Sequence, residues 1–453
     1  MFKTIINAWK VKDLRTKMLY TLLLIVVYRL GSFIPVPGVD AAALGSMVSQ
    51  YDFLNFLDLF SGGSLSQFSI FAMGISPYIT ASIILQLLTI AFPALEKLSK
   101  EDDGRVKIER ITRYVGVGLA LIQSVSIVVG LNSMGDLLEE VTIFGTSGFG
   151  VFMNGIMPYI TVGFCCTAGT AFLMWMGERI TEKGIGNGVS ILIFASIVSS
   201  VPQVVINLIN GTFGIKPVTD GSGIALQYHW WYIFAVIAVV LILVVGVTAV
   251  DKAERRIPIQ YAKRVVGRKT YGGNATHIPL KANANGVMPL IFAMTILQVP
   301  AMIGQFWPNG KYYAWVSEWL SARSDNPWGL VVYYLIYALL IVGFAYFYSS
   351  ITFNPVEIAK NLQQNGGTIP GRRPGKDTGD YIKRISNRLT LFGALFLMVI
   401  AIVPSVLLGL FNLDKALSAF GPTSILIMIS VALETSATLE SMMLMRHYKG
   451  FLG

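Results

Sequence analysis

The stretch Phe60–Pro93, FSGGSLSQFSIFAMGISPYITASIILQLLTIAFP, decides the fold. It opens as a polar, glycine-rich segment and becomes an apolar helix-former from Ile70 onward, interrupted at Gly74 and Pro77. A short polar helix followed by one long enough to cross a bilayer is a broken helix. Irregular backbone at membrane depth survives only inside protein or along a water-filled cavity. The stretch is therefore predicted to line a pathway.

Composition places the rest of the chain in a membrane. Of the 453 residues, 54% are apolar and only 13% are charged, whereas soluble domains carry about 25% charged residues. A transmembrane helix needs about 20 apolar residues. That measure gives ten spans, at 18–36, 70–92, 114–132, 152–175, 185–207, 229–250, 284–305, 329–350, 389–410 and 419–439. The sequence therefore predicts an all-α polytopic membrane protein with ten transmembrane helices.

The basic residues orient these spans. Thirty of the 35 lysines and arginines fall on one side of the predicted membrane, which marks that side, with both termini, as cytoplasmic. Four lie in the outer loops, and Arg29 lies within the first span. An ionisable residue inside a span is by default a functional hypothesis. For Arg29 the alternative is a structural role, with a buried partner or with snorkelling near a bend.

Two short echoes link the halves of the chain. The pattern G-[IV]-x-P-x-I occurs at 74–79 and at 286–291, and SILI occurs at 190–193 and at 424–427. Each echo pairs a span of the first five with its counterpart in the second five. An odd number of spans in each half forces the halves into opposite orientations. The echoes therefore predict two inverted five-helix halves, arranged as a clamshell with a pathway between them.

Both echoes end on isoleucine, at Ile79, Ile193, Ile291 and Ile427. We expect these four to face one another at mid-membrane, where paths between inverted repeats run. Ile75 lies about one helical turn before Ile79 and joins them. Isoleucine in a membrane helix otherwise faces lipid or packs in the core, and only the repeat symmetry separates these five from that role.

The predicted spans also divide the chain into segments. These are a basic amphipathic N-terminus (1–17), a first half (18–207), an external hinge loop (208–228), a second half (229–439) and a cytoplasmic tail (440–453). The second half carries two basic cytoplasmic loops, 251–283 and 354–388. The alternation of residues between glycines in the first loop predicts a protruding hairpin.

The sequence lacks the side-chain patterns of an enzyme. Its three histidines are far apart and have no metal-ligating neighbour at helical spacing. Neither H-E-x-x-H nor G-x-S-x-G occurs. A path lined by isoleucine suits a conduit that must not hold what passes and that closes by dewetting. The main alternative is an inverted-repeat secondary transporter of a small substrate, with coupling through Arg29 or Glu434. An intramembrane enzyme is a more distant one.

Six motifs occur in order along nearly the whole chain, Lys3 to Gly450. They are FSGGSLSQFSIFAMGISPYITASIILQLL, MWMGERITEKGIGNGVSILIFA, RRIPIQYAKR, THIPLKANANGVMPLIFA, FNPVEIAKNLQQNGGTIPGRRPG and RLTLFGALFL. Together they resemble the SecY family, the channel-forming subunit of the bacterial Sec protein translocase. The outer loops 208–228 and 306–328 fit the family least well.

The resemblance implies a protein-conducting channel in the bacterial plasma membrane. Such a channel translocates unfolded secretory polypeptides and releases membrane segments sideways through a lateral gate. The resemblance implies no catalysis, no cofactor and no metal. The partners that it implies are SecE, SecG, the SecA ATPase, the ribosome through its RNA, signal-sequence-bearing polypeptides and membrane lipid.

The resemblance also assigns roles to residues. It makes the five isoleucines Ile75, Ile79, Ile193, Ile291 and Ile427 a pore ring. It places a plug, a short helix sealing the outer funnel, at Ser61, Gly62, Gly63, Ser64, Leu65, Ser66, Gln67, Phe68, Ser69, Ile70 and Phe71.

A lateral gate and a docking surface follow in the same way. The gate would lie between spans two and three and spans seven and eight, with Thr80, Ile83, Gln86, Thr295 and Gln298. The polar members either hydrogen-bond across this gate or serve as ordinary contacts between helices. Docking of SecA or the ribosome would use Arg255, Arg256, Lys263, Arg264, Arg268, Lys269, Arg372 and Arg373. Arg373 matches the critical arginine of the family.

Overall fold

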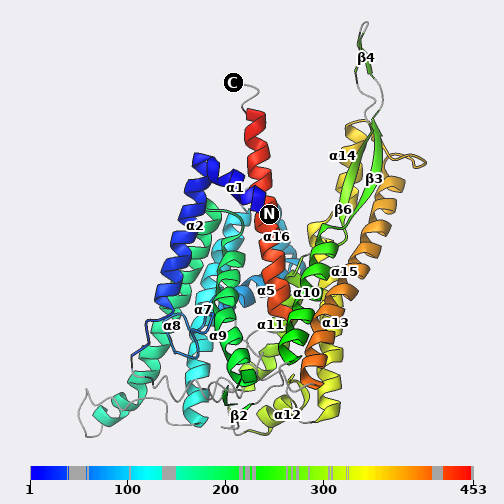
Figure 1. Ribbon diagram of the computed structural model, residues 1–453. Helices are drawn as coiled ribbons and strands as arrows, with labels where there is room; N and C mark the ends of the chain where they lie inside the picture. The colour runs from blue at the N-terminus through cyan, green and yellow to red at the C-terminus, as the bar shows by residue number, and fades with distance from the viewer. Residues whose placement is uncertain are drawn as a thin grey trace.

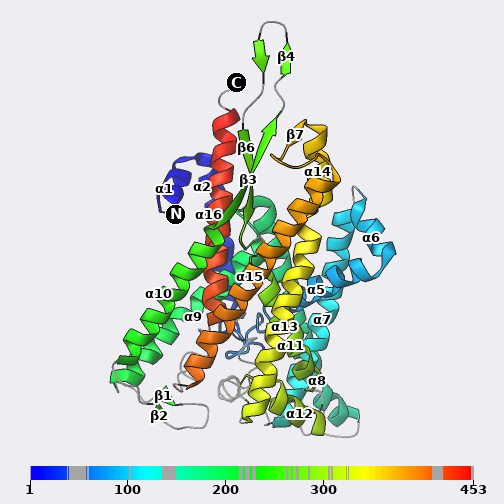
Figure 2. The same ribbon diagram turned by 90° about the vertical axis from the view of Figure 1, so that its right-hand side faces the viewer.

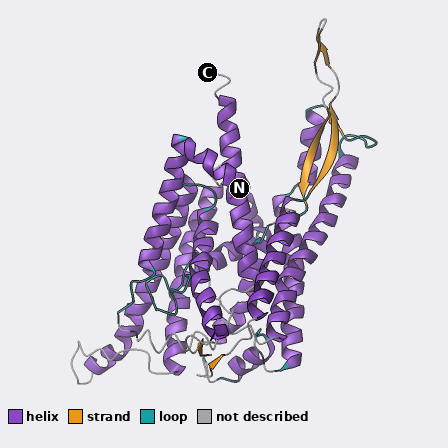
Figure 3. Ribbon diagram, in the orientation of Figure 1, coloured by secondary structure: helices purple, strands orange, loops and turns teal. Residues whose placement is uncertain are grey.

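The protein is mostly helical, with a few short strands (Figures 1 and 3). The computed structural model describes residues 2–37, 39, 58, 61–101, 104–134, 149–213, 218–219, 225–226, 231–261, 264–266, 269–271, 275–283, 286–304, 307, 310–322, 324, 326–410 and 422–449.

The first half is built from helices of different lengths, and a sharp bend joins two of them. They are α1 (Phe2–Lys10), α2 (Lys12–Gly31), α5 (Ser76–Ala91), α6 (Pro93–Lys100), α7 (Gly104–Met134), α8 (Phe149–Lys183) and α9 (Gly188–Phe213). Between α5 and α6 the chain turns by 107° at Phe92, since Pro93 cannot continue α5 but fits the first turn of a new helix.

The second half repeats this organisation. Its helices are α10 (Trp231–Lys252), α11 (Met288–Gly304), α12 (Lys311–Trp319), α13 (Pro327–Thr352), α14 (Pro355–Gln364), α15 (Lys376–Leu410) and α16 (Pro422–Lys449). The side chains of Asn326 and Asn354 accept backbone N–H groups at the starts of α13 and α14, and a proline follows each asparagine. Both features favour a helix start.

Each of the ten predicted spans overlaps one of these helices. By length and hydropathy, five of the described helices can cross a membrane, or six if α5 and α6 form one bent span. The first part of α9 and the whole of α11 are shorter apolar helices. Several helices extend into predicted loops or tails; for example, α7 begins at Gly104, α15 begins at Lys376 and α16 continues to Lys449. Lysine, arginine and glutamate are good helix formers, so these helices do not stop where the apolar run stops.

The two halves share a packing pattern. In the first half, α5 packs on α7, α7 on α8, α8 on α9 and α2 on α8. The same four contacts recur in the second half as α11 on α13, α13 on α15, α15 on α16 and α10 on α15. Gly74 and Gly286 precede the equivalent helices α5 and α11, with φ of +56° and +58°. Glycine adopts this left-handed backbone without strain, so the echo at 74–79 and 286–291 is a repeat of structure as well as of sequence.

The halves meet along two lines. On one side α9 packs against α10 and α16, and on the other α11 packs against α5 and α7. One large hydrophobic cluster draws buried residues from both halves. The N-terminal helix α1 also crosses between them, because it packs on α16 and buries Ala8 beside Leu439.

A small sheet joins the two predicted basic loops. Strand β3 (Glu254–Tyr261) pairs antiparallel with β6 (Ala275–Lys281), which confirms the predicted hairpin. Short strands β4 (Arg264–Val266) and β5 (Lys269–Tyr271) pair beyond it. On its other edge β3 pairs with β7 (Gly367–Thr368) from the second loop (Figure 2). These elements enclose their own core of Ile257, Ile259, Leu280, Leu362, Ile369 and Ile382. We call β3, β6, β7 and α14 the loop unit.

The two ends of the helical bundle carry different elements. The loop unit and the C-terminal end of α16 project from one end, and α12 lies at the other (Figures 1 and 2). In the predicted hinge loop, β1 (Val218–Thr219) pairs with β2 (Ala225–Leu226), and α9 extends into this loop to Phe213. The rest of residues 208–228 lies outside the described residues.

Candidate functional site

Five buried isoleucines belong to the large hydrophobic cluster that both halves share. Ile75 is the N-cap residue of α5 and Ile79 lies in its first turn, and the others come from α9, α11 and α16. All five are buried, from 1% exposed at Ile427 to 9% at Ile79, and all belong to one hydrophobic cluster. We call these five residues (Ile75, Ile79, Ile193, Ile291 and Ile427) the isoleucine ring. Their burial means that none of them lies on the exposed outer surface of the helices.

The plug segment, residues 61–71, is not a helix. Residues 62–75 form a run of turns, so the expected short helix is wrong. Gly62 and Gly63 have φ of +69° and +81°, and Phe68 has φ of +42°. An α-helix does not accommodate this left-handed backbone. The turns are closed locally, since the Ser64 hydroxyl donates to the Ser61 carbonyl at 2.7 Å and the Ser69 N–H donates to the Ser64 carbonyl at 2.9 Å.

A buried carboxylate stabilises the first turn of this segment. Asp58 accepts hydrogen bonds from the backbone N–H of Ser66 at 2.9 Å and from its hydroxyl at 2.6 Å. Burial raises the pKa of the Asp58 carboxyl, while the bonds from Ser66 act in the opposite direction. The Asp58 carboxyl group therefore lies against the plug segment and is bonded to it at Ser66.

The plug segment is hydrogen-bonded to the first half, and only its last residues, Ile70 and Phe71, also reach the cluster that both halves share. The N–H of Val36 donates to the Phe68 carbonyl at 2.9 Å, and the N–H of Ile70 donates to the Ile34 carbonyl at 3.0 Å. Leu65 and Phe68 are buried in a cluster with residues of α7 and α8. This cluster is separate from the one that holds the isoleucine ring.

Two glycines make this close packing possible. A Cβ added to Gly169 of α8 would lie 2.0 Å from the Ile70 carbonyl oxygen, and one added to Gly31 of α2 would lie 2.1 Å from the Phe71 ring. Real Cβ atoms do not approach so closely, so any other residue would displace the segment. The plug segment therefore fits a seat shaped for its backbone.

The predicted gate residues belong to α5 and α11, and α11 packs against both α5 and α7, a contact that we call the gate seam. Thr80 and Ile83 are buried on α5. The predicted bonds across the seam from Thr80 and Thr295 are absent, because Thr80 donates to Ser76 and Thr295 donates to Ile291, four residues earlier in their own helices. A hydroxyl four residues after a carbonyl in a helix can reach it without any partner helix. A bond that does cross the seam runs from the Ser126 hydroxyl to the Met302 carbonyl, at 3.4 Å.

Three glutamines leave oxygen atoms unpaired inside the protein. The side-chain carbonyls of Gln86 on α5, Gln123 on α7 and Gln298 on α11 are buried and accept no hydrogen bond. Gln86 donates through its amide nitrogen to Ser82 of its own helix, at 3.3 Å. A buried acceptor without a partner is costly, so these three helices are held less firmly than their apolar packing alone would hold them.

Asp251 ties together three parts of the second half. Its carboxylate accepts from the Asn283 amide at 2.9 Å and from the Ser430 hydroxyl at 3.0 Å. Asp251 ends α10, Asn283 precedes α11, and Ser430 lies one turn after Ile427 on α16. The sequence analysis did not identify this group; the one signal in the sequence was an acidic residue directly after the predicted span 229–250.

The docking arginines lie on the loop unit and on the turn after β7. Arg255 and Arg256 are exposed on β3, where Arg256 pairs with Glu254 at 2.6 Å. Arg372 and Arg373 are exposed, and the Arg372 guanidinium lies 5.0 Å from the centre of the Tyr381 ring. Lys263 and Arg268 lie outside the described residues. Arg264 and Lys269 begin β4 and β5.

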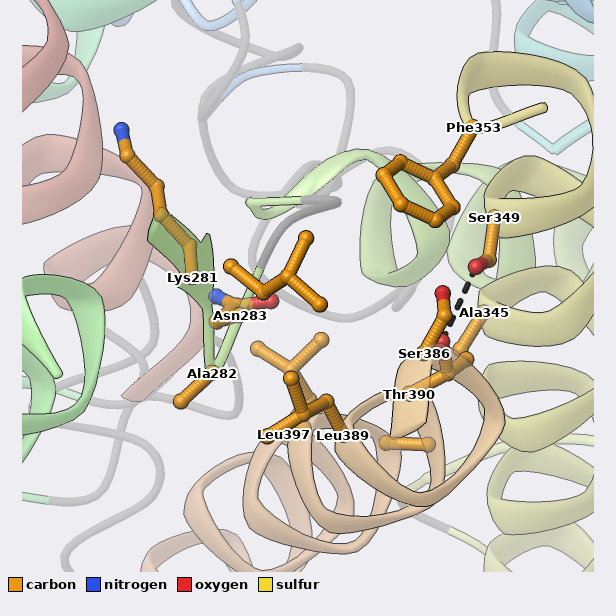
Figure 4. Close-up of a pocket in the computed structure, with 13 residues that line it drawn as sticks. Lys281, Ala282, Asn283, Ala345, Ser349, Phe353, Ser386, Leu389, Thr390 and Leu397 are labelled. Atoms are coloured by element: carbon orange, nitrogen blue, oxygen red, sulfur yellow. Dashed lines mark hydrogen bonds between the residues drawn. The ribbon is translucent and has the colours of Figure 1, made fainter. Parts of the chain in front are cut away.

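A small hollow opens beside the loop unit (Figure 4). It is lined mainly by apolar residues of α13, α15 and the end of β6, including Phe353 and Leu397. The Ser349 and Thr390 hydroxyls share a hydrogen bond of 2.9 Å in its wall, opposite Asn283. The hollow belongs to the second half alone and is not the path between the halves.

The described residues contain no group of three or more histidine, cysteine, aspartate or glutamate side chains placed to hold a metal ion. The isoleucine ring itself offers no hydrogen-bonding group. The arrangement offers a buried apolar cluster shared by the two halves, a packed segment whose last residues reach it, and helices that carry unpaired amide oxygens.

Comparison with known proteins gives a consistent result. A family model described as SecY matches residues 69–436. The protein translocase subunit SecY of Streptomyces galbus is 44% identical over 461 residues, with all of both chains covered. Among solved structures, one described as a protein conducting channel has a TM-score of 0.64 at 18% identity and covers 94% of this chain and 92% of its own. Sec61 in the canine ribosome-channel complex has a TM-score of 0.57 at 15% identity and the same coverage.

Proposed function

This chain belongs to the SecY family of protein translocase subunits, and on that premise we propose how its parts act together. It is the protein-conducting channel of the Sec translocase, a multi-pass membrane protein that is not an enzyme. We propose that it passes unfolded secretory polypeptides across the bacterial plasma membrane, with both termini in the cytoplasm, and releases membrane segments sideways. The observation that carries this proposal is the burial of all five ring isoleucines in one cluster at the junction of the halves.

Family membership sets aside the transporter alternative. That alternative needed Arg29 or Glu434 as a coupling group inside the membrane. Glu434 is exposed on α16, and Arg29 bonds to neutral groups of the plug segment and α9.

We propose that the isoleucine ring is an apolar seal. An ion that enters it must lose hydration without gaining any partner, and a narrow apolar constriction excludes water. Branched aliphatic side chains also make no specific bonds to a passing peptide. The ring would therefore tolerate any sequence while it blocks ions.

The seal proposal is tested directly by cross-linking the ring positions to a polypeptide that is held in the channel during transport. In a chain with Cys165 and Cys166 replaced by alanine, single cysteines at positions 75, 79, 193, 291 and 427 should each cross-link to a stalled export substrate. A cysteine at Ile84, which is 37% exposed on the same helix as Ile79, should not. Cross-links at Ile84 that match those of the ring would place the path elsewhere.

We propose that residues 61–71 form the plug, which blocks the outer funnel when the channel is idle. Deleting Ser64–Phe68 removes the buried Leu65 and Phe68 and is expected to leave a channel that transports protein but opens spontaneously. Single-channel recording should show frequent brief openings that the intact chain lacks. A chain that neither leaks nor transports would show that the segment serves another purpose.

We propose that the lateral gate opens along the gate seam, between α5 and α7 on one side and α11 and α13 on the other. The buried unpaired glutamine oxygens lower the stability of the closed gate. When the gate seam opens to lipid, these amides gain access to water or to a polar substrate.

Replacing Gln298 with leucine should therefore stabilise the closed gate. It removes a buried, unpaired acceptor whose cost is about 1–3 kcal/mol, so the complex should unfold at higher temperature and transport should slow. Gln364→Leu, on the exposed end of α14, is the control. An unchanged transport rate in Gln298→Leu would mean that Gln298 does not limit opening.

We propose that the loop unit and the Arg372–Arg373 turn dock cytosolic partners. Exposed arginines suit both the phosphates of ribosomal RNA and an acidic surface of the SecA ATPase. Support comes from the fold shared with Sec61, whose structure was solved in a ribosome-channel complex. We further propose that SecE clamps the two halves and that SecG binds at the periphery.

A further inference from the structure

Two adjacent side chains of α2 reach the beginning of the plug segment. The hydroxyl of Tyr28 donates to the carbonyl oxygen of Ser61 at 2.8 Å and lies 2.7 Å from the hydroxyl of Ser196 on α9. Tyr28, Ser61 and Ser196 are all buried. The Tyr28 ring also stacks on Phe71 at the other end of the segment, with 5.8 Å between ring centres.

Arg29 makes a parallel set of contacts. Its guanidinium donates to the carbonyl oxygen of Gly62 at 2.9 Å and to the hydroxyl of Ser199 on α9 at 3.2 Å. The Ser199 hydroxyl is itself 3.3 Å from the same Gly62 carbonyl. Both partners of Arg29 are neutral oxygen atoms, so their separation leaves no opposite charge unpaired.

The backbone of the plug segment is fitted to this site. Gly62 has φ of +69°, and a Cβ at this position would lie 2.8 Å from the Ser199 hydroxyl oxygen and 3.0 Å from the Ser196 Cα. Glycine alone avoids both the strain and the collision. The bonds reach carbonyl oxygens rather than plug side chains, so they hold the segment whatever side chains it carries.

We infer that Tyr28, Arg29, Ser196 and Ser199 form a latch that holds the plug closed and sets how strong a signal sequence must be to open the channel. This inference rests on the proposed role of residues 61–71 as the plug. The four are positioning residues that contact the plug backbone. The latch needs the side chains of α2 and the hydroxyls of α9 together, and α9 is a helix that packs on α10 and α16 of the other half. A shift of α9 relative to α2, driven by separation of the halves, would pull the two sets apart and release the plug.

The test compares single variants in the purified translocase complex, reconstituted into bilayers. Tyr28→Phe keeps the ring that stacks on Phe71 and removes only the hydroxyl, and Arg29→Gln removes the charge. Each should raise idle ion conductance about tenfold, which corresponds to about 1.4 kcal/mol. Each should also permit export of a substrate with a defective signal sequence. The matched control is Ser200→Ala, because Ser200 bonds only to the Ile197 carbonyl of its own helix.

A second measurement distinguishes the latch proposal from the plug proposal. In a chain with Cys165 and Cys166 replaced by alanine, a cysteine at Ser64, which is 1% exposed, should be alkylated faster when Tyr28→Phe is added. If the chain lacking Ser64–Phe68 leaks but Tyr28→Phe neither leaks nor changes alkylation, the latch is wrong and the plug stands. If the deletion itself does not leak, the plug proposal fails and the latch fails with it.

Discussion

Reversing the charge of Arg373, as in Arg373→Glu, is expected to abolish ATP-driven protein transport while the chain still inserts into the membrane. Arg373 is exposed on the turn after β7, and its carbonyl accepts the Thr378 hydroxyl at 2.8 Å. That bond fixes the turn without using the arginine side chain, so the substitution should not unfold the loop unit. A glutamate there would face an acidic partner, and like charges across an interface cost several kcal/mol.

Transport into reconstituted vesicles with SecA is the measurement, and we expect a loss of at least about 100-fold. Lys360→Glu on the exposed face of α14 makes the same charge change away from the turn and should transport nearly as well as the parent. Equal losses in the two variants would indicate a general effect of charge on the basic loops. Normal transport by Arg373→Glu would refute the docking role.

Asparagine in the isoleucine ring is the second change with a large expected effect. Ile79→Asn or Ile291→Asn places an amide in a buried apolar cluster, where it can hydrate the constriction and give ions a partner. Idle conductance in planar bilayers should rise by about tenfold or more, because an unpaired amide in an apolar site costs about 1–3 kcal/mol and draws in water. Signal-sequence discrimination should loosen at the same time.

Ile79→Leu is the matched control, because it keeps an apolar side chain of equal size. It should seal as the parent does. If Ile79→Asn and Ile79→Leu conduct alike, the ring does not serve as the seal.

The spans and the repeat could be predicted because the bilayer imposes them. Helix length follows from membrane thickness, and Gly74 and Gly286 had to be glycine because each adopts a left-handed backbone before an equivalent helix. The same symmetry singles out the isoleucines that are buried in one cluster, and their role as a pore ring stays a prediction. In each case the physical constraint acts on the residue itself, so the constraint is visible in the sequence.

Other features depended on distant backbone and were not predictable in the same way. The plug segment was expected to be helical, but Gly62, Gly63 and Phe68 adopt left-handed conformations that an α-helix does not accommodate, and the segment packs on α7, α8 and α9, which are distant in sequence. Arg29 was identified as unusual, yet its partner is the Gly62 carbonyl, and backbone acceptors carry no sequence signature. Likewise, nothing local in Gly367–Thr368 indicates that this strand pairs with Gln260 and Tyr261.

That last pairing has a mechanical consequence. Because β7 pairs with the edge of β3, the two basic loops share one sheet and one core and form a single stiff arm. A protein that binds either loop therefore binds the whole arm. The arm is continuous with α10, α11 and α15, which all belong to the second half, whereas residues 61–71 are hydrogen-bonded to residues of the first half. A force on the arm therefore acts on the second half as a unit and tends to turn it relative to the first half, about the contacts of α9 with α10 and α16.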